Sequence, residues 1–600
     1  MANSVVSRGG VTNLFFALGL CVFAVMAGLG GHKLQFGMNF IDEGMYMADG
    51  WRLAAGDSLF PDSSPSVVRL YALFNAVIFE LWPDVTLLEF RWIQYGATML
   101  AILAMSLALY RTTGEYWYLP WIMSLFAFTG LDPVGMSANL SYYTYPHLFA
   151  TLHTATLLLA LVTKAARYRA SLLVVSGVFL WAVGFCFLPL AASAIVPLVL
   201  WGLARVFGNK SAGLRFSFKD ALSVTAPVLV LWIGVLAKYN TDFVGAVLDM
   251  LRYFTETSEI AISRPVATEF QYYGAAAVLL ALFLVALRLP RDRALAATGL
   301  AGLTAFAVIE TNLFGAIELY WRGWFAAPMW FAALLIAFSG FYIIHVVRMH
   351  RTSARLDDRG LLILFLLVPG FVIGTVFAFT SGMGPLAMCY VAIPVVAGLS
   401  CYVVSGAGRG VISGAATLVA LLFPFYYATA WADWRFTYFD LPPAHLNHTV
   451  ENGFAKGIRT NAAYAQIIGW IEMQVSQHSS GDDLAVFFDQ VPMGYMIARR
   501  RPSIDHSWAG MAFSPSLRRE STEKMVRLGR EPTVAFKFHS LPLFLPLSLK
   551  DETFSPPGRQ LFAADNPLNN YVVHNMELAG QVNMGEQKWI ELFIQKSQNR

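Results

Sequence analysis

Charged residues are scarce in this chain. Asp, Glu, Lys and Arg make up 13% of its 600 residues, against roughly 25% in an ordinary soluble domain. The two signs also nearly balance, with a net charge of +4, so no concentrated basic face is available for a nucleic acid. Hydrophobic residues make up 57% of the chain instead. A soluble fold cannot bury that much apolar surface, and we therefore expect an integral membrane protein.

Cysteine is scarce too. Cys21, Cys186, Cys389 and Cys401 all fall in apolar stretches, and no CxxC or Cys/His spacing indicates a metal site. We predict that all four are small core residues. Internal repeats are also lacking in the apolar region, which disfavours the repeat-built transporter folds.

Apolar windows of about 20 residues, the length that crosses a bilayer, recur up to about residue 428. The first window, Val11 to Gly31, is longer than the apolar part of a signal peptide and lacks an Ala-x-Ala exit, so we expect it to be retained. About thirteen transmembrane helices are predicted, over residues 11–31, 86–110, 117–131, 146–163, 170–187, 189–206, 221–238, 271–288, 294–312, 323–347, 361–380, 386–403 and 410–428.

Lys and Arg concentrate in alternate breaks between these windows, as they do in short cytoplasmic loops. This pattern predicts that the N-terminus lies in the cytoplasm, and an odd helix count then leaves the tail outside. The basic breaks contain Arg8, Arg111, Lys164, Arg205, Arg288, Arg348 and Arg409, and the opposite breaks contain Asp42, Glu43, Asp57, Asp132, Asp242, Glu256 and Glu318.

The tail, residues 429–600, holds no further apolar window. Residues 483–489 have the pattern of a buried strand, and residues 495–499 follow as a short helix. The predicted architecture is a polytopic α-helical transmembrane domain, 1–428, followed by an extracytoplasmic α/β domain, 429–600.

The first external loop, residues 32–85, is the most informative segment. Asp42 and Glu43 follow the first apolar window, and Met45 to Ala55 has the periodicity of an amphipathic helix lying along the membrane interface. Gly56 and Asp57 then indicate the end of that helix. A second amphipathic stretch, Val67 to Trp82, precedes the next spanning helix.

A carboxylate pair at a lipid surface suits proton abstraction from a sugar hydroxyl, or the binding of a divalent cation against a phosphate. Arg69 and Arg91 follow the pair, and guanidinium groups bind phosphate through forked hydrogen bonds. The alternative is an ordinary external loop, in which the acids are solvated and the arginines reach up to lipid head groups.

The order of these residues resembles the GT-C glycosyltransferases. Within them it is most similar to the branch of bacterial lipid A aminoarabinose transferases and protein O-mannosyltransferases. In that branch the first external loop carries an essential Asp or Asp-Glu, and the donor is a polyprenyl-phosphate sugar. The matching positions, which lie within about 55 residues, are Asp42, Glu43, Tyr46, Gly56, Asp57 and Arg91.

The resemblance implies an inverting transferase that moves a sugar from a polyprenyl-phosphate donor to an acceptor at the outer face. Asp42 would be the general base, and Glu43 and Asp132 would orient it or hold a divalent cation, Mg or Mn. The donor phosphate would meet Arg69, Arg91, Arg264 and Arg322, and the sugar or acceptor would meet Tyr46, Tyr142, Tyr143 and His147.

Some choices stay open. Relatives often carry Lys-Pro-Pro where this chain has Val67, Val68 and Arg69, which leaves the subfamily and the acceptor undecided among a lipid, a glycan and a protein. Tyr142, Tyr143 and His147 also suit an aromatic belt or core packing, and Asp132 suits a turn. The expected location is the bacterial inner membrane, with the tail in the periplasm and no nucleic-acid partner.

Three rival functions remain. A transporter or flippase for a lipid-linked sugar would need charges inside its spans, where this chain has few. An O-antigen ligase or polymerase usually places its key Arg and His in a late external loop. The third rival is a non-catalytic scaffold whose tail binds a partner.

Overall fold

The computed structural model describes most of the chain. The described residues are 8–59, 70–129, 140–208, 215–262, 335–348, 356–380, 384–406, 434–438, 440–488, 491–507, 515–539, 566–583 and 589–596, with a few single residues between 277 and 351.

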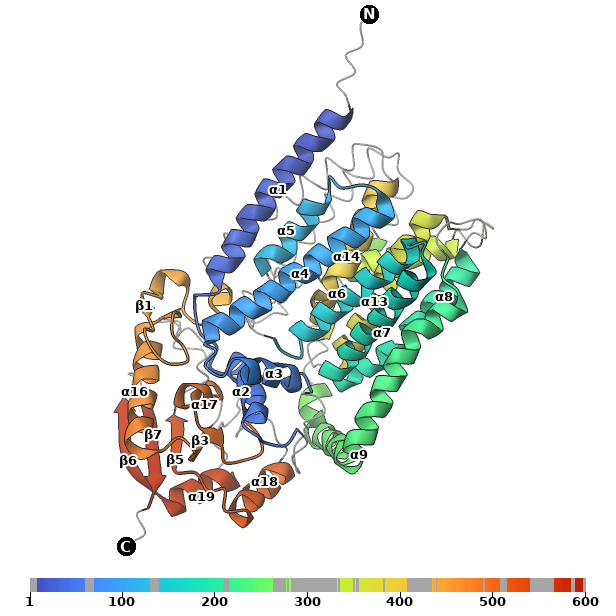
Figure 1. Ribbon diagram of the computed structural model, residues 1–600. Helices are drawn as coiled ribbons and strands as arrows, with labels where there is room; N and C mark the ends of the chain where they lie inside the picture. The colour runs from blue at the N-terminus through green and yellow to red at the C-terminus, as the bar shows by residue number, and fades with distance from the viewer. Residues whose placement is uncertain are drawn as a thin grey trace, which may run out of the picture.

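The N-terminal two thirds of the described chain form a helical bundle (Figure 1). Its elements are α1 (Arg8–Lys33), α2 (Asp42–Ala54), α3 (Ala72–Leu81), α4 (Leu87–Thr113), α5 (Leu119–Thr129), α6 (Thr144–Val162), α7 (Ala166–Cys186), η2 (Leu188–Ile195), α8 (Val196–Phe207), α9 (Phe218–Ile262), α13 (Asp358–Thr380), η3 (Gly384–Val391) and α14 (Ala392–Gly406).

Within the described ranges, seven helices are long and apolar enough to cross a membrane. They coincide with the windows predicted at 11–31, 86–110, 146–163, 170–187, 189–206, 221–238 and 361–380. The windows at 117–131 and 386–403 coincide with shorter apolar helices, and the second half of the window at 323–347 coincides with a third, Leu335–Arg348. Those at 271–288, 294–312 and 410–428 lie largely or wholly outside the described residues. The chain is a polytopic membrane protein, and the count of thirteen stays a prediction.

Helix α6 lies at the centre of the bundle, because 72% of its most apolar window is buried by other parts of the protein. Helix α1 is peripheral, with 22% buried. That position corrects one prediction: Cys186, Cys389 and Cys401 are buried, but Cys21 on α1 is exposed. A peripheral helix in a membrane needs an apolar outer face. Free cysteine behaves as a small hydrophobic residue, so it suits that face as it suits a core.

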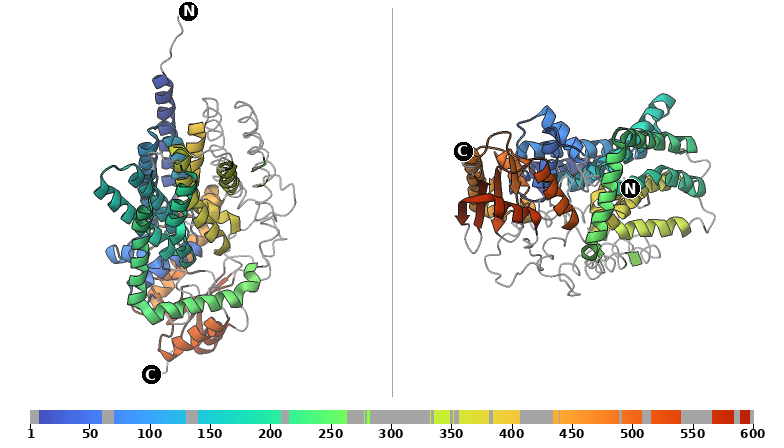
Figure 2. Two further views of the ribbon diagram at one scale, coloured as in Figure 1. Left: turned by 90° about the vertical axis from the view of Figure 1, so that its right-hand side faces the viewer. Right: turned by 90° about the horizontal axis from the view of Figure 1, so that it is seen from below.

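Helix α9 changes direction at Asn240, whose φ of 24° and ψ of −103° are not helical. Its first part, up to Asn240, belongs to the candidate spans. Its second part turns away and runs across the end of the bundle (Figure 2). The chain thus leaves the predicted membrane region near the end of the window at 221–238.

The C-terminal residues form a mixed sheet with helices around it. Its elements are η4 (Trp434–Thr437), η5 (Pro443–His445), β1 (His448–Thr449), β2 (Arg459–Thr460), α16 (Ala462–His478), β3 (Leu484–Phe487), α17 (Met493–Ala498), β4 (Arg501–Pro502), α18 (Pro515–Arg527), β5 (Val534–His539), α19 (Pro567–Asn575), β6 (Met576–Asn583) and β7 (Trp589–Gln595).

Five of these strands form one sheet in the order β4-β3-β5-β7-β6. The first three are parallel, and β7 pairs antiparallel with both β5 and β6. The strand predicted at 483–489 contains β3, and the helix predicted at 495–499 begins two residues earlier, as α17. The strand follows from a run of apolar residues that the sheet buries, and the helix from a second apolar run, Met493–Ala498, that is buried as well.

The C-terminal sheet lies at the end of the bundle opposite the N-terminus, and α2 and α3 lie between the two parts (Figure 1). Backbone bonds join the parts: Gly37 donates to the carbonyl of Arg459 at 2.8 Å, and Arg459 donates to that of Gln35 at 2.7 Å. The helix predicted at Met45 to Ala55 is α2. We predicted that this helix lies along the membrane interface with one face open. In the structure protein covers it from several sides, since Glu43 to Gly50 are all buried.

Candidate functional site

The two acids of the first loop begin α2. The side-chain oxygen of Asn39 accepts hydrogen bonds from the backbone N–H groups of Ile41 at 3.0 Å and Asp42 at 3.1 Å, which fixes the turn into the helix. Asp42 and Glu43 are then the first two helical residues. Adjacent residues of an α-helix point about 100° apart, so the two carboxylates meet different surroundings.

Glu43 is locked to Arg91 of α4. The Arg91 Nε lies 2.7 Å from one carboxylate oxygen of Glu43, and its Nη2 lies 2.6 Å from the other. Arg91 also donates to the carbonyls of Leu34 at 2.6 Å and Gly37 at 3.0 Å, and its guanidinium lies over the ring of Tyr438 at 4.4 Å. This forked pair joins the end of α1 to α2 and α4.

Neither member of this pair is exposed, since both side chains have 0% of their surface accessible. We predicted that Arg91 binds the donor phosphate, and that Glu43 orients the base or holds a metal. In the structure the two charges pair with each other inside the protein, and the phosphate and metal roles stay predictions. Their arrangement suits holding α2 in place.

Asp42 is only partly buried, and it lies beside a group of tyrosines. Its negative charge acts on Tyr46, whose pKa is raised well above the usual value, first by burial and then by Tyr142 and Asp42. The ring of Tyr46 lies 5.6 Å from that of Tyr142 and 5.8 Å from that of Tyr71. The Tyr46 phenol therefore stays protonated at neutral pH and can donate a hydrogen bond.

The structure brings the three predicted tyrosines together. Tyr142 donates to the hydroxyl of Tyr143 at 2.5 Å, and Tyr143 stacks on Tyr390 with ring centroids 5.0 Å apart. His147 lies further along α6, fully buried, with its ring edge-on to Phe126 at 6.4 Å. The tyrosines thus form one aromatic group beside Asp42, and His147 packs in the bundle core.

Two polar residues that the sequence reasoning missed support this group. Asn75 of α3 is fully buried, donates to the carbonyls of Tyr46 at 3.1 Å and Leu140 at 2.9 Å, and accepts from Tyr145 at 2.9 Å. Asp49 accepts from Ser507 at 2.5 Å and from Tyr71 at 3.5 Å. The one local signal for Asn75 is an amide within an otherwise apolar helical stretch, Ala72–Leu81.

Helix α2 ends just before Gly56, as predicted. Gly56 has a φ of +94°, a conformation that glycine adopts without strain, and its N–H bonds back to the carbonyl of Leu53 at 3.0 Å. Asp57 follows and faces three arginines of different elements. Its carboxylate oxygens lie 3.8 Å from Arg52, 3.7 Å from Arg501 and 3.5 Å from Arg530.

Four predicted residues lie outside the described residues: Arg69, Asp132, Arg264 and Arg322. In the part of the chain that is described, no three His, Cys, Asp or Glu side chains gather as a metal site would need. A divalent cation, Mg or Mn, stays a prediction, because one of its expected ligands is Asp132.

No protein-family model matches the chain, and no curated protein matches it either. Among solved structures, it is similar to the oligosaccharyltransferase of Archaeoglobus fulgidus in a complex with Zn and sulfate. The identity is 12% and the TM-score 0.41, over 86% of this chain and 67% of that one. A second structure of that organism's oligosaccharyltransferase, AglB with an inhibitory peptide and a dolichol-phosphate, has 10% identity and a TM-score of 0.40, over 86% and 69%.

The chain is also similar to ArnT from Cupriavidus metallidurans bound to undecaprenyl phosphate, at 14% identity and a TM-score of 0.37, over 98% of each chain. Both proteins are GT-C superfamily members, and ArnT is an aminoarabinose transferase, which is the kind of protein that the first loop resembles.

Proposed function

We propose that this protein is a GT-C glycosyltransferase. It moves a sugar from a polyprenyl-phosphate donor to an acceptor at the outer face of the membrane, and Asp42 is its general base. One observation carries the proposal: two adjacent carboxylates at the end of the helical bundle have separate surroundings. Glu43 is fully buried in its pair with Arg91, whereas Asp42 is partly exposed and lies close enough to Tyr46 for its charge to act on that phenol.

The chemistry needs one base and no enzyme nucleophile. The Asp42 carboxylate accepts the proton of the acceptor hydroxyl while that oxygen attacks the anomeric carbon of the donor sugar. The bond from that carbon to the phosphate oxygen breaks, and its electron pair leaves with the lipid phosphate. A single displacement inverts the configuration at the anomeric carbon. Arg69, Arg264 and Arg322 remain our candidates for stabilising the departing phosphate.

Glu43 and Arg91 act in this proposal as positioning residues. Their forked contact fixes the first turn of α2 to α4, and thereby the carboxylate of Asp42. Tyr46, Tyr142 and Tyr143 supply phenol groups at the place where the sugar or the acceptor would lie. The C-terminal domain would then lie in the periplasm, over the site.

The test replaces Asp42 in the full-length protein, purified in lipid nanodiscs. The substrates are a panel of synthetic undecaprenyl-phosphate monosaccharides together with an extract of envelope lipids and glycans, and the released undecaprenyl phosphate is measured by mass spectrometry. We expect Asp42→Asn to lose about 10²- to 10⁴-fold in turnover, with an unchanged thermal unfolding temperature. Asp42→Glu should keep part of the activity.

The matched control is Glu80→Gln. Glu80 is an exposed carboxylate on the neighbouring helix α3, and neutralising it should leave turnover unchanged. If Asp42→Asn transfers sugar as fast as the unmodified protein, the general-base assignment is overturned. If no panel member is turned over by the unmodified protein, the donor class is overturned.

A further inference from the structure

The helix that carries Asp42 is attached to the C-terminal domain along its whole length. The carbonyl of Phe40, just before α2, accepts from the N–H of Met493 at 3.0 Å. Gly44 packs directly on that domain, since a Cβ added to it would lie 2.3 Å from the nitrogen of Met493. Asp49 in mid-helix accepts from Ser507 at 2.5 Å.

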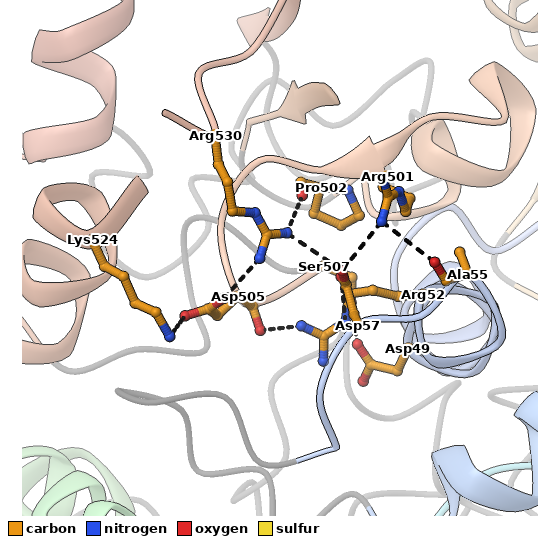
Figure 3. Close-up of polar contacts among 10 residues, drawn as sticks. All are labelled: Asp49, Arg52, Ala55, Asp57, Arg501, Pro502, Asp505, Ser507, Lys524 and Arg530. Atoms are coloured by element: carbon orange, nitrogen blue, oxygen red, sulfur yellow. Dashed lines mark hydrogen bonds and ion pairs between the residues drawn. The ribbon is translucent and has the colours of Figure 1, made fainter. Parts of the chain in front are cut away.

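Charged contacts continue this attachment at the far end of α2. Arg52 donates to the carbonyl of Asp505 at 2.5 Å, and Lys524 lies 2.8 Å from the Asp505 carboxylate. Arg530 lies between the two parts, 3.5 Å from Asp57 of the loop and 3.4 Å from Asp505 of the domain. Figure 3 shows these side chains converging from α2 on one side and from the C-terminal domain on the other.

The acids in this cluster depend on their partners. Only 7% of the side-chain surface of Asp57 and of Asp505 is accessible, so water cannot replace a missing cation. Among the residues drawn in Figure 3, Arg530 is the one whose guanidinium lies within 3.5 Å of the carboxylates of both acids. Arg52, in contrast, meets the Asp57 carboxylate and the Asp505 backbone carbonyl. Removing its charge should loosen the cluster on both sides at once.

We propose that the C-terminal domain sets the position of Asp42 by clamping α2, and that Arg530 is the positioning residue of this clamp. This inference rests on the proposed function. Helix α2 has 13 residues and behaves as a rod about 20 Å long, so a displacement of its far end tilts the helix about its first turn and changes the direction in which Asp42 points. A misplacement of about 1 Å is enough to cost on the order of 100-fold in rate.

The variants for the test are Arg530→Gln and the conservative Arg530→Lys, in the full-length protein in nanodiscs. Arg527→Gln is the matched control, because Arg527 is an exposed arginine on α18. Hydrogen exchange of residues 42–57 is measured without substrate. The kcat and the donor KM are measured with the undecaprenyl-phosphate monosaccharide panel.

For Arg530→Gln we expect faster exchange in residues 42–57 and a kcat lower by about tenfold, with a donor KM within about twofold. Arg530→Lys should recover part of both effects, and Arg527→Gln should match the unmodified protein. Unchanged exchange in Arg530→Gln overturns the clamp, whichever donor is used. Faster exchange with an unchanged kcat overturns the positioning role.

The two proposals fail in different ways. The exchange measurement needs no donor, so it tests the clamp even if the protein transfers no sugar. A normal turnover in Asp42→Asn would overturn the proposed function, whereas a normal exchange pattern in Arg530→Gln would overturn the clamp alone.

Discussion

The two ends of α2 are both held by ion pairs, but the pairs differ in kind. At the first end, Glu43 meets one arginine through two contacts of 2.6 and 2.7 Å, and neither side chain is exposed. At the other end, Asp57 faces three arginines at 3.5 to 3.8 Å. Two of them are partly exposed, Arg530 at 27% and Arg501 at 37%.

This difference indicates two kinds of joint. A buried pair with forked geometry holds one arrangement, because either charge left alone in the interior is strongly unfavourable. A cluster of longer contacts that reaches water has several arrangements of similar energy, and salt screens it. The end of α2 that carries Asp42 is therefore held in one arrangement, and the far end, where Asp57 meets Arg501 and Arg530 of the C-terminal domain, is held more loosely.

The largest expected effect comes from breaking the buried pair of Glu43 and Arg91. Glu43→Gln leaves the Arg91 charge buried without its acid, and we expect the free energy of unfolding to fall by about 3–5 kcal/mol. Thermal and denaturant unfolding of the purified protein in nanodiscs would measure this, with Glu80→Gln as the control. A loss below about 1 kcal/mol would show that the pair is not the fixed joint described here.

A smaller effect, on the pH dependence of stability, is expected from Asp440, in the segment that covers the Glu43–Arg91 pair. Tyr438 lies over Arg91, and Asp440 follows it, accepting from the N–H of Leu441 at 2.7 Å, from Asn461 at 2.5 Å and from the hydroxyl of Thr460. Burial raises the pKa of Asp440 from 3.8 to about 6, although these hydrogen bonds oppose the rise.

The folded protein thus holds the Asp440 proton more tightly than the unfolded chain does. Stability from this group is fully present below about pH 4 and is lost as the pH rises through about 6, a change of about 3 kcal/mol. The unfolding temperature of the unmodified protein should therefore fall between pH 4 and 7.5, and Asp440→Asn should remove this contribution to the fall. If the variant and the unmodified protein have parallel curves, the raised pKa is contradicted.

The smallest effect should come from the exposed bridge between Asp84, before α4, and Arg499, after α17. The contact is 2.7 Å, but the side chains are 83% and 50% exposed. Arg499→Gln should change the free energy of unfolding by less than about 1 kcal/mol. A larger loss in the same unfolding assay would mean that exposed ion pairs between the bundle and the C-terminal domain stabilise the protein as much as the buried Glu43–Arg91 pair does.

Local pattern was enough to predict most described elements of the helical bundle, but only β3 and α17 in the C-terminal domain. Hydropathy located seven spans, the helix after Asp42 was expected, and Gly56 was identified as its end. These features depend on residues close together in the chain, and so they can be predicted from the sequence. Arg69, Asp132, Arg264 and Arg322 stay predictions.

The roles of charged residues were harder to predict. Arg91 was assigned to a phosphate because guanidinium groups bind phosphate through forked hydrogen bonds, and the structure shows its fork on Glu43, 48 residues away. Asp49, Arg52 and Asn75 carried no motif. The contacts of Asp49 and Arg52 depend on Ser507 and Asp505, more than 450 residues further along the chain.

The sequence by itself determined that this chain crosses a membrane repeatedly and that an acidic motif begins the helix after the first span. Both follow from apolar length and local capping, which need no partner. Only the tertiary structure decided which acid is locked and which is partly exposed, and that the C-terminal domain holds α2. Burial and charge pairing depend on segments far apart in the chain, and packing alone brings them together.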